Sequence, residues 1–598
     1  MKLKTLFFIL LSSCLSAQFS FNYQRDWATY FGAVNSQITG IYEDSSSNII
    51  VDAKTSSPNP VLGTPPASYY NQFITAGNQS YTGSFLVPNN FSGKFTSAGN
   101  LISAGYSPYA TPVSSAKFPY FRDRNGNMYE FQTNLITYPA LSPGGWLTNA
   151  PDSTNMILTK YDVNNTMLWQ TYLPGNNNVN NLEVDNNGNI YVAGTTKWQN
   201  LADPGTFQPT FDMVYDADGI ILPNSYIVKL NPQGQKIWAT YTPSILLVGM
   251  TAFEDKLYII GNKDLKPTGA DLSTSGTFQP AKAGQFIARL NANTGQRTWG
   301  TYYGIPGNNI DAGLSDIKAD ETGVYINGVT LGVAGNYYAT EGAYKSQCTD
   351  GVDMFVTKFD HSGRRVWSTY IGTDGYESFT GYRGLDVKNG KLLFTGLSYT
   401  DQNISTPGAY ITTKPNPNNQ DIFFGILDTG NGFPDFISYY GGTNPGSTAS
   451  SPECIFLKDS DGFFIYGNTG RTVGYSSPNG YQPNIIYPVG ITIGTSSFIA
   501  KFSPKQLSTS DADIAGDLVL YNNPNNGNFS LKGNVLSKGP HIISINDMSG
   551  RLIYSKNIQK NKEQSFNLEN QLTNGSYILS VSKNDKTLLK TFKLTVRK

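Results

Sequence analysis

The sequence predicts an all-β fold: a seven-bladed β-propeller, closed by pairing of its N- and C-terminal strands and followed by a small β-sandwich. Three observations lead to this prediction. The composition combines 60 Gly and 38 Tyr with only 14% charged residues, which is typical of short strands joined by turns. A unit of about 69 residues recurs seven times along the chain. The last 88 residues then differ from these repeats in charge and pattern.

The N-terminus has the features of a signal peptide. Two lysines precede an apolar run, Leu6–Leu11, and small residues follow it. We expect cleavage after Ala17, so that the signal peptide is residues 1–17. In an alternative reading this segment ends in a lipoprotein box, and Cys14 becomes the acylated first residue. No later apolar run reaches 18 residues, so we expect no transmembrane segment in the mature chain.

Charge and composition exclude several classes of function. The formal net charge is zero, whereas nucleic-acid binding needs an excess of Lys and Arg. Two His and three Cys in the whole chain leave little for metal sites or His-based catalysis, and we expect no metal and no cofactor. Cys348 and Cys454 are the thiols that remain after export. An oxidising compartment permits a disulfide between them, and burial as two small hydrophobic residues is the simpler interpretation.

The clearest landmark of the repeat is W-x-T-Y. It begins at Trp27, Trp169, Trp238, Trp299 and Trp367. Phe436 takes the place of Trp in a further copy, and a degenerate copy is expected near residue 98. Because these aromatic residues recur once per unit, we interpret them as packing residues between sheets rather than as ligand-stacking residues.

Two further landmarks accompany each W-x-T-Y strand. One is a Gly followed by an aromatic residue, as in Gly205-Thr206-Phe207, and Trp146 stands at the aromatic place of an earlier copy. The other is a hairpin of the type Asp185–Gly194, in which Asn and Gly supply the positive φ of a tight turn. Each unit therefore contains about four short strands, which favours a β-propeller over the alternative of a strand-only solenoid.

The two ends of the repeat array also favour a closed ring. Internal units carry a strand, a turn and then the W-x-T-Y strand. The array begins with WATYFG at Trp27, which lacks the first of these strands, and ends with SSFIAKFSP around Phe498, which lacks the second. If the two orphan strands pair, no edge strand stays exposed. We therefore expect a propeller domain over residues 18–504.

The region of about residues 25–504 resembles the bacterial seven-bladed β-propeller repeat family, whose units carry W-x-T-Y-x-G, D-x-x-G-N-x-Y-V-x-G and a Gly-aromatic segment. The resemblance implies the fold and says little about activity, since propellers include both binders and enzymes. A unit of about 69 residues is longer than four strands need, so long loops must cover one or both faces.

The C-terminal 88 residues carry 12 Lys and Arg against 7 Asp and Glu, a balance of +5, whereas residues 18–510 carry −7. The polar stretch KQLSTSDADIAGD precedes this shift. We therefore expect a linker at residues 505–516 and a separate β-domain at residues 517–598.

Four spaced elements of this domain form a recognisable series: an Asn-rich turn with its strand, a D-x-x-G-R turn, an L-x-x-G-x-Y strand and a basic terminus. The residues are Tyr521, Pro524, Gly527, Phe529, Asp547, Gly550, Arg551, Leu572, Gly575, Tyr577, Lys593 and Lys598. Together they resemble the type A C-terminal sorting domain of the type IX secretion system of Bacteroidota.

This resemblance implies a small β-sandwich that the outer-membrane secretion machinery reads. It also implies that the domain is usually cleaved off, leaving the product released or tethered to surface lipopolysaccharide. One departure is Asn522, because the family usually has Pro directly after the opening Tyr. The alternative reading of residues 517–598 is a generic immunoglobulin-like module.

Few residues are candidates for chemistry. Trp198 belongs to no repeat landmark and could stack on a sugar ring or a partner, or pack within its loop. Acidic pairs such as Asp216 and Asp218 resemble calcium loops but lack the later ligands, so turn chemistry explains them. His361 falls in a hairpin turn, where we expect it to be exposed, and His541 falls in the C-terminal domain. The sequence contains no G-x-S-x-G, Walker A, C-x-x-C or H-E-x-x-H motif.

These observations lead to two hypotheses. The favoured one is a secreted or cell-surface propeller, exported through the signal peptide and the type IX system, that binds a glycan or a protein without chemistry. The alternative is a polysaccharide-active enzyme with paired Asp or Glu residues in the central channel. We name no catalytic residue, and Trp198 is the one candidate ligand contact.

Overall fold

The computed structural model describes most of the chain after the signal segment. It covers residues 21–598 except 57–64, 79, 82–88, 111–119, 124, 133–139, 151–155, 165, 175–178, 217, 243–245, 263–271, 309–310, 333, 349–351, 374, 379–382, 401, 418, 443–448, 491–493, 506–517, 548–550 and 585–587. The predicted signal peptide with Cys14 and nearly all of the predicted linker, residues 505–516, therefore lie outside the described residues. The chain forms two compact units, residues 1–504 and 505–598.

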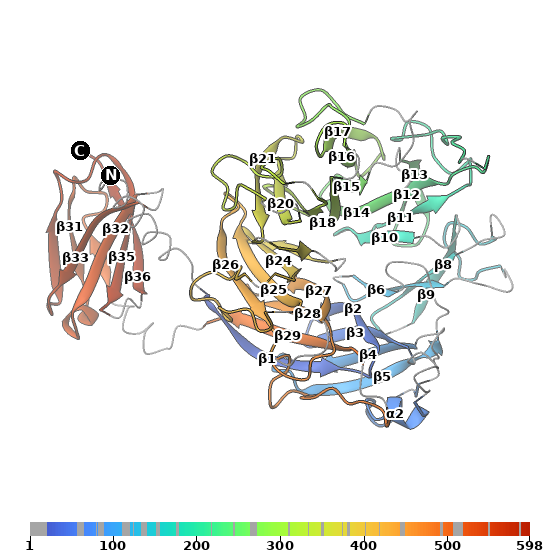
Figure 1. The fold of residues 1–598 in the computed structure, drawn as a ribbon, viewed down its shortest axis with the longest axis horizontal. Coiled ribbons are helices and arrows are strands. Elements are labelled where there is room, and N and C mark those ends of the chain that lie inside the picture. Colours follow the sequence, from blue (N-terminus) through green and yellow to red (C-terminus); the bar gives the residue numbers. More distant parts are fainter. Residues whose placement is uncertain are drawn as a thin grey trace. The chain divides into compact units, whose positions relative to one another are not determined.

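The first unit is built from seven antiparallel sheets, here called blades 1 to 7, each with its first strand nearest the centre of the ring (Figure 1). The strands are β2 (Ser36–Glu43), β3 (Ile49–Thr55), β4 (Asn89–Phe95) and β5 (Leu101–Ala110) in blade 1; β6 (Tyr120–Arg122), β7 (Met128–Gln132), β8 (Met156–Tyr161) and β9 (Met167–Leu173) in blade 2; β10 (Val179–Val184), β11 (Ile190–Thr196), β12 (Asn224–Leu230) and β13 (Lys236–Tyr241) in blade 3; β14 (Leu246–Phe253), β15 (Lys256–Asn262), β16 (Gln285–Asn291) and β17 (Arg297–Tyr303) in blade 4; β18 (Ala312–Asp320), β19 (Gly323–Thr330), β20 (Met354–Phe359) and β21 (Arg365–Ile371) in blade 5; β22 (Glu377–Ser378), β23 (Leu385–Lys388), β24 (Lys391–Ser398), β25 (Asp421–Asp428) and β26 (Pro434–Tyr440) in blade 6; and β27 (Ala449–Phe456), β28 (Phe463–Thr469), β29 (Ser496–Pro504) and β1 (Tyr23–Phe31) in blade 7.

Blade 7 joins the two ends of the array. Strand β1 pairs antiparallel with β29, with Thr29 opposite Ile499 and Tyr30 opposite Phe498. The first strand of the chain is thus the outer strand of the last blade. The predicted fold class, with its terminal closure, is confirmed. The closed ring excludes the alternative of a strand-only solenoid.

Blade 6 differs from the others in its innermost strand. Two short strands, β22 and β23, both pair with β24, so that one interrupted strand lines the centre of the ring. The short helix α2 (Ala67–Asn71) lies in the connection between β3 and β4 of blade 1. No helix in the described part of the chain is long and apolar enough to cross a bilayer.

The tight hairpins form because Asp and Asn bond their own turns. In the outer hairpin of blade 5, Asp360 Oδ1 accepts the N–H groups of Ser362 at 2.9 Å and Arg364 at 3.0 Å. Gly363 follows with φ +85°, a conformation that glycine adopts without steric cost. Such turns join the first to the second strand and the third to the fourth strand of a blade, so they share one face of the ring.

The longer connections leave from the opposite face, here called the loop face. In each blade the second strand leads to the third through a long segment, such as residues 331–353 in blade 5 and 399–420 in blade 6. The expected long loops are therefore concentrated on one face, which frees that face for function.

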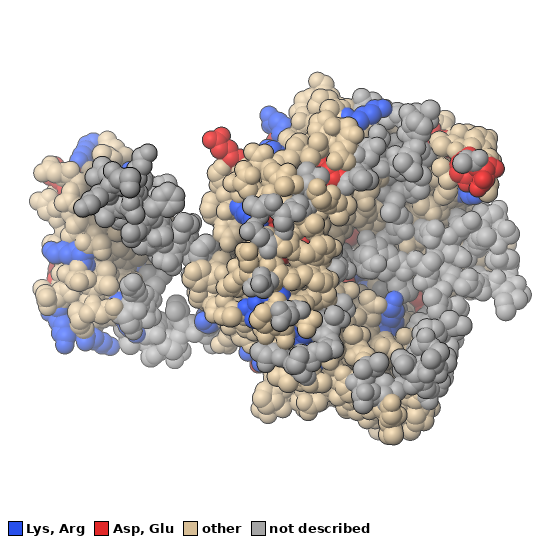
Figure 2. Space-filling view, in the orientation of Figure 1, with Lys and Arg blue, Asp and Glu red and all other residues tan. Residues whose placement is uncertain are grey.

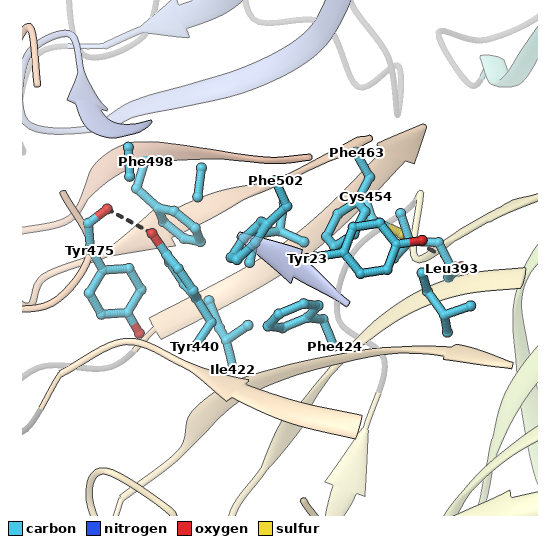
Figure 3. Close-up of a cluster of buried hydrophobic side chains, with 14 of the residues drawn as sticks. Tyr23, Leu393, Ile422, Phe424, Tyr440, Cys454, Phe463, Tyr475, Phe498 and Phe502 are labelled. Carbon is cyan, nitrogen blue, oxygen red and sulfur yellow. Dashed lines mark hydrogen bonds between the residues drawn. The ribbon is translucent and has the colours of Figure 1, made fainter. Parts of the chain in front are cut away.

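Aromatic side chains fill the space between blades. Between blades 6 and 7, Phe424, Tyr440, Phe463 and Phe502 pack against one another, and the Tyr440 hydroxyl donates to the Tyr475 carbonyl at 3.0 Å (Figure 3). All four side chains are completely buried. Burial of this kind contributes about 1.5–3 kcal/mol per large apolar side chain.

The second unit is a β-sandwich with its own apolar core. One sheet contains β30 (Val519–Tyr521), β31 (Asn528–Lys532) and β34 (Glu563–Asn567). The other contains β33 (Leu552–Ile558), β32 (His541–Asp547), β35 (Gly575–Lys583) and β36 (Leu588–Val596). A 3-10 turn, η2 (Asn534–Ser537), precedes β32.

Candidate functional site

The Trp of each W-x-T-Y motif reaches into the next blade. Its indole N–H donates to a backbone carbonyl in the outer turn of that blade at 2.9–3.1 Å. The pairs are Trp27 with Ser97, Trp169 with Pro232, Trp238 with Ala292, Trp299 with His361 and Trp367 with Thr429. A glycine with positive φ follows in each turn, and the indole occupies the space of its missing side chain, as Trp299 does at Gly363.

A cation on the third strand shares the same carbonyl. Lys229 Nζ donates to the Ala292 oxygen at 2.9 Å, beside Trp238. Lys229 also lies 5.1 Å from the ring centroid of Tyr191, the Tyr of the D-x-x-G-N-x-Y hairpin. Burial lowers the pKa of this lysine. Four other cations likewise donate to the carbonyl that accepts the indole N–H: Lys160, Arg289, Lys358 and Lys501.

The other residues of W-x-T-Y hold the long connection of their own blade. In blade 5 the Thr369 hydroxyl accepts the N–H of Lys345 at 3.0 Å, and the Tyr370 hydroxyl accepts the N–H of Tyr338 at 3.1 Å. In blade 7 the Tyr30 hydroxyl donates to the carbonyl of Arg471 at 2.6 Å. Trp, Thr and Tyr of the motif are thus all used in holding the ring together, which supports their interpretation as packing residues.

Carboxylates on the innermost strands of the blades bind backbone groups of neighbouring blades. Glu183 accepts the N–H of Ala252 at 3.5 Å, and Asp386 accepts that of Phe456 at 2.7 Å. Asp316 accepts the N–H of Leu385 at 3.0 Å. These three acidic side chains therefore join blades 3 to 4, 6 to 7 and 5 to 6.

Two cations lie among these acids. Lys318 contacts Asp316 at 3.4 Å. Burial acts to lower the pKa of Lys318, but Asp316, Glu183 and Asp386 outweigh it and raise that pKa, so the lysine is charged. Arg383 of blade 6 reaches past blade 7 to blade 1, where it donates to the Thr39 carbonyl at 3.4 Å. Its guanidinium also lies 4.9 Å from the ring centroid of Phe121 in blade 2.

Another pair of carboxyl groups converges between blades 5 and 6. Asp353 and Glu377 have no exposed surface, and a Cβ on Gly372 would collide with oxygens of both. Lys345 contacts Asp353 at 2.8 Å, and Ser398 donates to Glu377 at 3.1 Å. Burial, followed by the neighbouring Asp353, raises the pKa of Glu377 to about 8. Glu377 is therefore protonated at neutral pH.

A buried ion pair occupies the next position around the ring. Arg471 bonds Asp421, and neither side chain has exposed surface. Asn416 donates to the same carboxylate through its backbone and side-chain nitrogens at 2.9 Å. The Arg471 guanidinium also donates to the Gln420 carbonyl. Because Tyr30 bonds the Arg471 carbonyl, this pair links blade 6 to the closing blade.

Trp198, the residue singled out from the sequence, lies two residues after the end of β11. Its ring is half-buried and stacks on Trp146 with centroids 6.3 Å apart at 26°. The backbone N–H of Trp198 donates to the Thr196 hydroxyl at 3.0 Å, and its backbone carbonyl accepts from the Tyr241 hydroxyl. These contacts favour the packed-loop alternative for Trp198.

Sequence reasoning missed a pair of exposed tyrosines on the loop face of blade 6. Tyr376 precedes β22, and Tyr399 follows β24. Their side chains are 45% and 43% exposed, and their rings meet edge to face with centroids 4.9 Å apart. Neither belongs to a repeat landmark, and strand register alone brings them together. The interruption of the first strand in blade 6 hid that register in the sequence.

The acidic pairs and the histidines have structural partners. Asp216 Oδ1 accepts the N–H groups of Asp218 at 3.0 Å and Ile220 at 2.9 Å, as turn chemistry predicts. No group of three or more His, Cys, Asp or Glu suited to a metal ion occurs in the described residues. The expected exposure of His361 is wrong: its ring is half-buried, bonds the Tyr258 hydroxyl at 2.6 Å and stacks on Phe253. His541 is buried on β32.

The two remaining cysteines, Cys348 and Cys454, are buried, and they are not joined by a disulfide. They act as small hydrophobic residues in two different clusters.

Several of the predicted sorting-domain residues stabilise the sandwich itself. Phe529 is buried and stacks on Phe566 with centroids 5.0 Å apart. Leu572 is buried, and the buried Tyr577 donates from its hydroxyl to the Thr573 carbonyl at 2.9 Å. These three residues of the predicted pattern are therefore part of the apolar core of the sandwich.

Other residues of the pattern lie where the chain turns or where a strand begins. Gly527 has φ +107° and lies against the backbone of Glu569, where a Cβ would collide. Gly575 opens β35. Asp547 accepts from the backbone and side chain of Arg551 at 3.0 Å. Gly550 of the same turn lies outside the described residues.

The exposed members of the pattern lie on the surface of the sandwich. Tyr521 is 47% exposed, and the Arg551 side chain is 76% exposed. Pro524, Lys593 and Lys598 are also exposed. The polypeptide terminus is held by a bond from the Lys598 N–H to Asn574 at 2.6 Å.

Charged side chains are sparse and scattered over the described part of the face in Figure 2. One compact group of acidic side chains lies at the upper right of this view, and the other charged side chains are separated from one another.

Comparison with known proteins identifies the second unit. Residues 519–595 match the family model described as a secretion system C-terminal sorting domain. The chain therefore carries the sorting domain of the type IX secretion system, and it is a type IX cargo, secreted or displayed on the cell surface. No curated protein matches the sequence significantly.

Solved structures resemble the chain at low identity. PorZ, an essential surface component of the type IX secretion system of Porphyromonas gingivalis, is 10% identical over 94% of this chain and 70% of its own, with a TM-score of 0.24. The lignostilbene dioxygenase of Pseudomonas brassicacearum is 11% identical over 74% and 85%, with a TM-score of 0.35. An ulvan lyase of polysaccharide lyase family PL25 is 10% identical over 79% and 94%, with a TM-score of 0.35. Similarity at this level says nothing about shared activity.

Proposed function

We propose that this exported propeller acts outside the cell as a binding protein without chemistry of its own, and that its ligand, a glycan or a protein, meets the loop face. The observation that supports this proposal is the structural role of the carboxylates on the innermost strands. Glu183, Asp316 and Asp386 each accept a backbone N–H of the neighbouring blade. A carboxylate engaged in this way is held as a structural acceptor, whereas a general acid or base must reach a substrate.

The loop face supports the location of the binding surface. It carries the longest connections of every blade, and these are positioned by a rigid ring. The opposite face consists of tight turns whose Asp and Asn side chains bond their own backbone. Loops held on such a scaffold are suited to recognition.

The test uses the full-length exported protein on an array of bacterial and plant glycans and, in parallel, in assays for hydrolysis and elimination with the same glycans. We expect binding without new reducing ends or unsaturated products. Turnover of any bound glycan would contradict the proposal.

A second candidate function is polysaccharide cleavage by the Asp353–Glu377 pair. The convergence of the two groups and the raised pKa of Glu377, about 8, resemble an acid and its partner in a hydrolase. Against this, both side chains are fully buried. If this candidate is right, Glu377→Gln abolishes cleavage and Glu183→Gln does not.

We further propose that the sorting domain is of type A, and that its removal releases the propeller or tethers it to surface lipopolysaccharide. The spacing of Asp547, Arg551, Leu572 and Tyr577 supports this finer assignment. Deleting residues 511–598 is expected to leave the protein in the periplasm. Unchanged extracellular amounts would contradict the assignment.

A further inference from the structure

We propose that Tyr376 and Tyr399 form a stacking platform for a neutral sugar ring. This inference rests on the proposed binding function and names its ligand class and its site. The platform lies on the loop face of blade 6, where the first strand, β22, begins and the second strand, β24, ends.

Strand register places the two tyrosines opposite each other. Glu377 pairs with Ser398 in the β22–β24 ladder, so Tyr376 and Tyr399 form the next pair. The Tyr399 N–H donates to the Tyr376 carbonyl at 2.9 Å. The interplanar angle of the rings is 88°. One ring can therefore present its face to a sugar while the other ring contacts it edge to face. Directly opposite residues on one side of such a ladder have neighbouring side chains.

The backbone beneath the platform is fixed by buried contacts. Ser398 donates to Glu377 at 3.1 Å. Beyond Tyr399, the hydroxyl of Tyr439 accepts the N–H of Ile404 and donates to the Gln402 carbonyl, both at 3.2 Å. A binding surface that is ordered before it meets its ligand avoids the entropic cost of ordering two flexible side chains and a loop.

The repeat does not require aromatic residues at these two positions. In blade 5 the same register places Asp311 opposite Leu331, joined by the same backbone bond at 2.8 Å. In blade 1 it places Asn35 opposite Ser56. The exposed tyrosines of blade 6 are therefore not explained by blade packing, in contrast to the Trp residues of W-x-T-Y.

The chemistry of the platform favours a neutral sugar. Tyrosine combines an apolar ring with a hydroxyl, which matches a pyranose with its C–H face and its hydroxyl rim. Gln402, three residues after Tyr399, is exposed and adds an amide that can bond such a rim. Two tyrosines bury about 300–500 Å² at most, less than the roughly 800 Å² per partner of a stable protein interface. One or two sugar rings therefore fit the platform better than a protein does.

The experiment measures binding of the full-length protein to five hexasaccharides by calorimetry. Four are neutral, made of β-1,4-glucose, β-1,3-glucose, β-1,4-xylose and β-1,4-mannose, and the fifth is hexagalacturonic acid. We expect the wild-type protein to bind at least one neutral hexasaccharide. Tyr376→Ala and Tyr399→Ala should each weaken that binding about tenfold or more, while Tyr376→Phe and Tyr399→Phe keep most of it, since stacking survives.

Leu331→Ala is the matched control, because Leu331 occupies the same register position in blade 5 and is also exposed. It should bind like the wild-type protein, and so should Trp198→Ala. Thermal unfolding of each variant reports whether the ring is intact, and the Phe variants keep the test valid if an Ala variant fails to fold.

Two results would overturn the inference in different ways. Equal binding by wild-type protein and both Ala variants would reject the platform and leave the binding function standing. Failure of the wild-type protein to bind any neutral hexasaccharide would reject the ligand class. If the wild-type protein bound no neutral hexasaccharide but a protein partner bound its loop face, the proposed binding function would stand. If the loop face bound neither, the sugar platform and the binding function would both be rejected.

Discussion

Five blade interfaces carry Trp, and the interface that closes the ring carries Phe436 instead. At the five, the next blade presents an outer turn whose carbonyl accepts the indole N–H. Blade 7 has no such turn, because its two outer strands come from opposite ends of the propeller. Strand β29 is the last strand of the propeller and β1 is the first, so no hairpin connects them. An indole there would bury an N–H without an acceptor, which costs about 1–3 kcal/mol.

The chain start fills the space that the missing turn leaves. Phe21 meets Phe436 edge to face with ring centroids 4.8 Å apart, and Tyr23 lies 5.8 Å away from it. All three side chains are buried. The residue at this motif position therefore depends on its acceptor: Trp occurs where a turn carbonyl can accept the indole N–H, and a purely apolar ring occurs where no such turn exists.

Blades 1 and 2 show a second exception, which is polar. Arg122 bonds Asp52 at 2.8 Å, and both side chains are almost fully buried. Glu130 accepts from Tyr161 at 3.0 Å and from Asn90 at 3.3 Å, and burial raises the pKa of Glu130. This interface is where the W-x-T-Y pattern is degenerate, near residue 98.

The largest expected effect follows from removing the closing strand. Deleting residues 18–31 leaves β29 with an unpaired edge, and it exposes Phe436 and the other buried side chains that pack against the removed strand. We expect loss of cooperative unfolding of the propeller unit, measured by calorimetry. A deletion variant that unfolds as one unit near the wild-type temperature would show that closure contributes little.

The buried ion pair at the seam should have the next largest effect. Arg471→Met leaves the carboxylate of Asp421 without its cation in a site with no exposed surface. Breaking such a pair costs about 3–5 kcal/mol, measured by urea unfolding. The double variant Arg471→Met with Asp421→Leu should recover much of this loss, and an equally unstable double variant would argue that the charge is not the cause.

Stability should depend on pH through Glu377. Its pKa is about 8 in the folded protein and about 4.3 in an unfolded chain. The folded state therefore keeps a proton that the unfolded state has lost, and stability falls as pH rises from about 4.3 to about 8. Over that range Glu377→Gln should flatten the fall by a few kcal/mol, as measured by urea unfolding at each pH. The same slope in both proteins would contradict the assignment.

The smallest effect sharpens the Trp comparison. Trp299→Phe removes one hydrogen bond to the His361 carbonyl, which still accepts from Arg289 at 3.1 Å, so we expect a loss of about 1–2 kcal/mol. Phe436→Trp should give no gain and cost about 1–3 kcal/mol through overpacking. Thermal unfolding of the two variants measures both, and stabilisation by Phe436→Trp would mean that the seam does offer an acceptor.

Much of the fold could be predicted from the sequence. The blade number and the closure followed from Trp27, Phe498 and the period, because each repeat must bury the same face against its neighbour. The sorting domain followed from residues such as Gly527 and Tyr577, whose roles are local. The repeat and the sorting domain depend on patterns that are local in the sequence, and the closure follows from the incomplete units at the two ends of the array.

The candidate site could not be predicted in this way. Tyr376 and Tyr399 meet through the register of one interrupted strand, and Asp353 meets Glu377 across two blades. Trp198 stood out only because it lay outside the repeat, and its stacking partner, Trp146, lies in the preceding blade. Contacts between blades depend on side-chain directions that spacing does not encode.

Ring closure is the claim on which the blade assignment and the loop face depend, and an engineered disulfide tests it most directly. Gln24 and Ser503 are Cα partners in the β1–β29 ladder, a separation that a disulfide spans without strain. We expect Gln24→Cys with Ser503→Cys to oxidise quantitatively in the folded protein, giving a compact band on a non-reducing denaturing gel. Two thiols that stay free while the protein remains folded would contradict the closed ring.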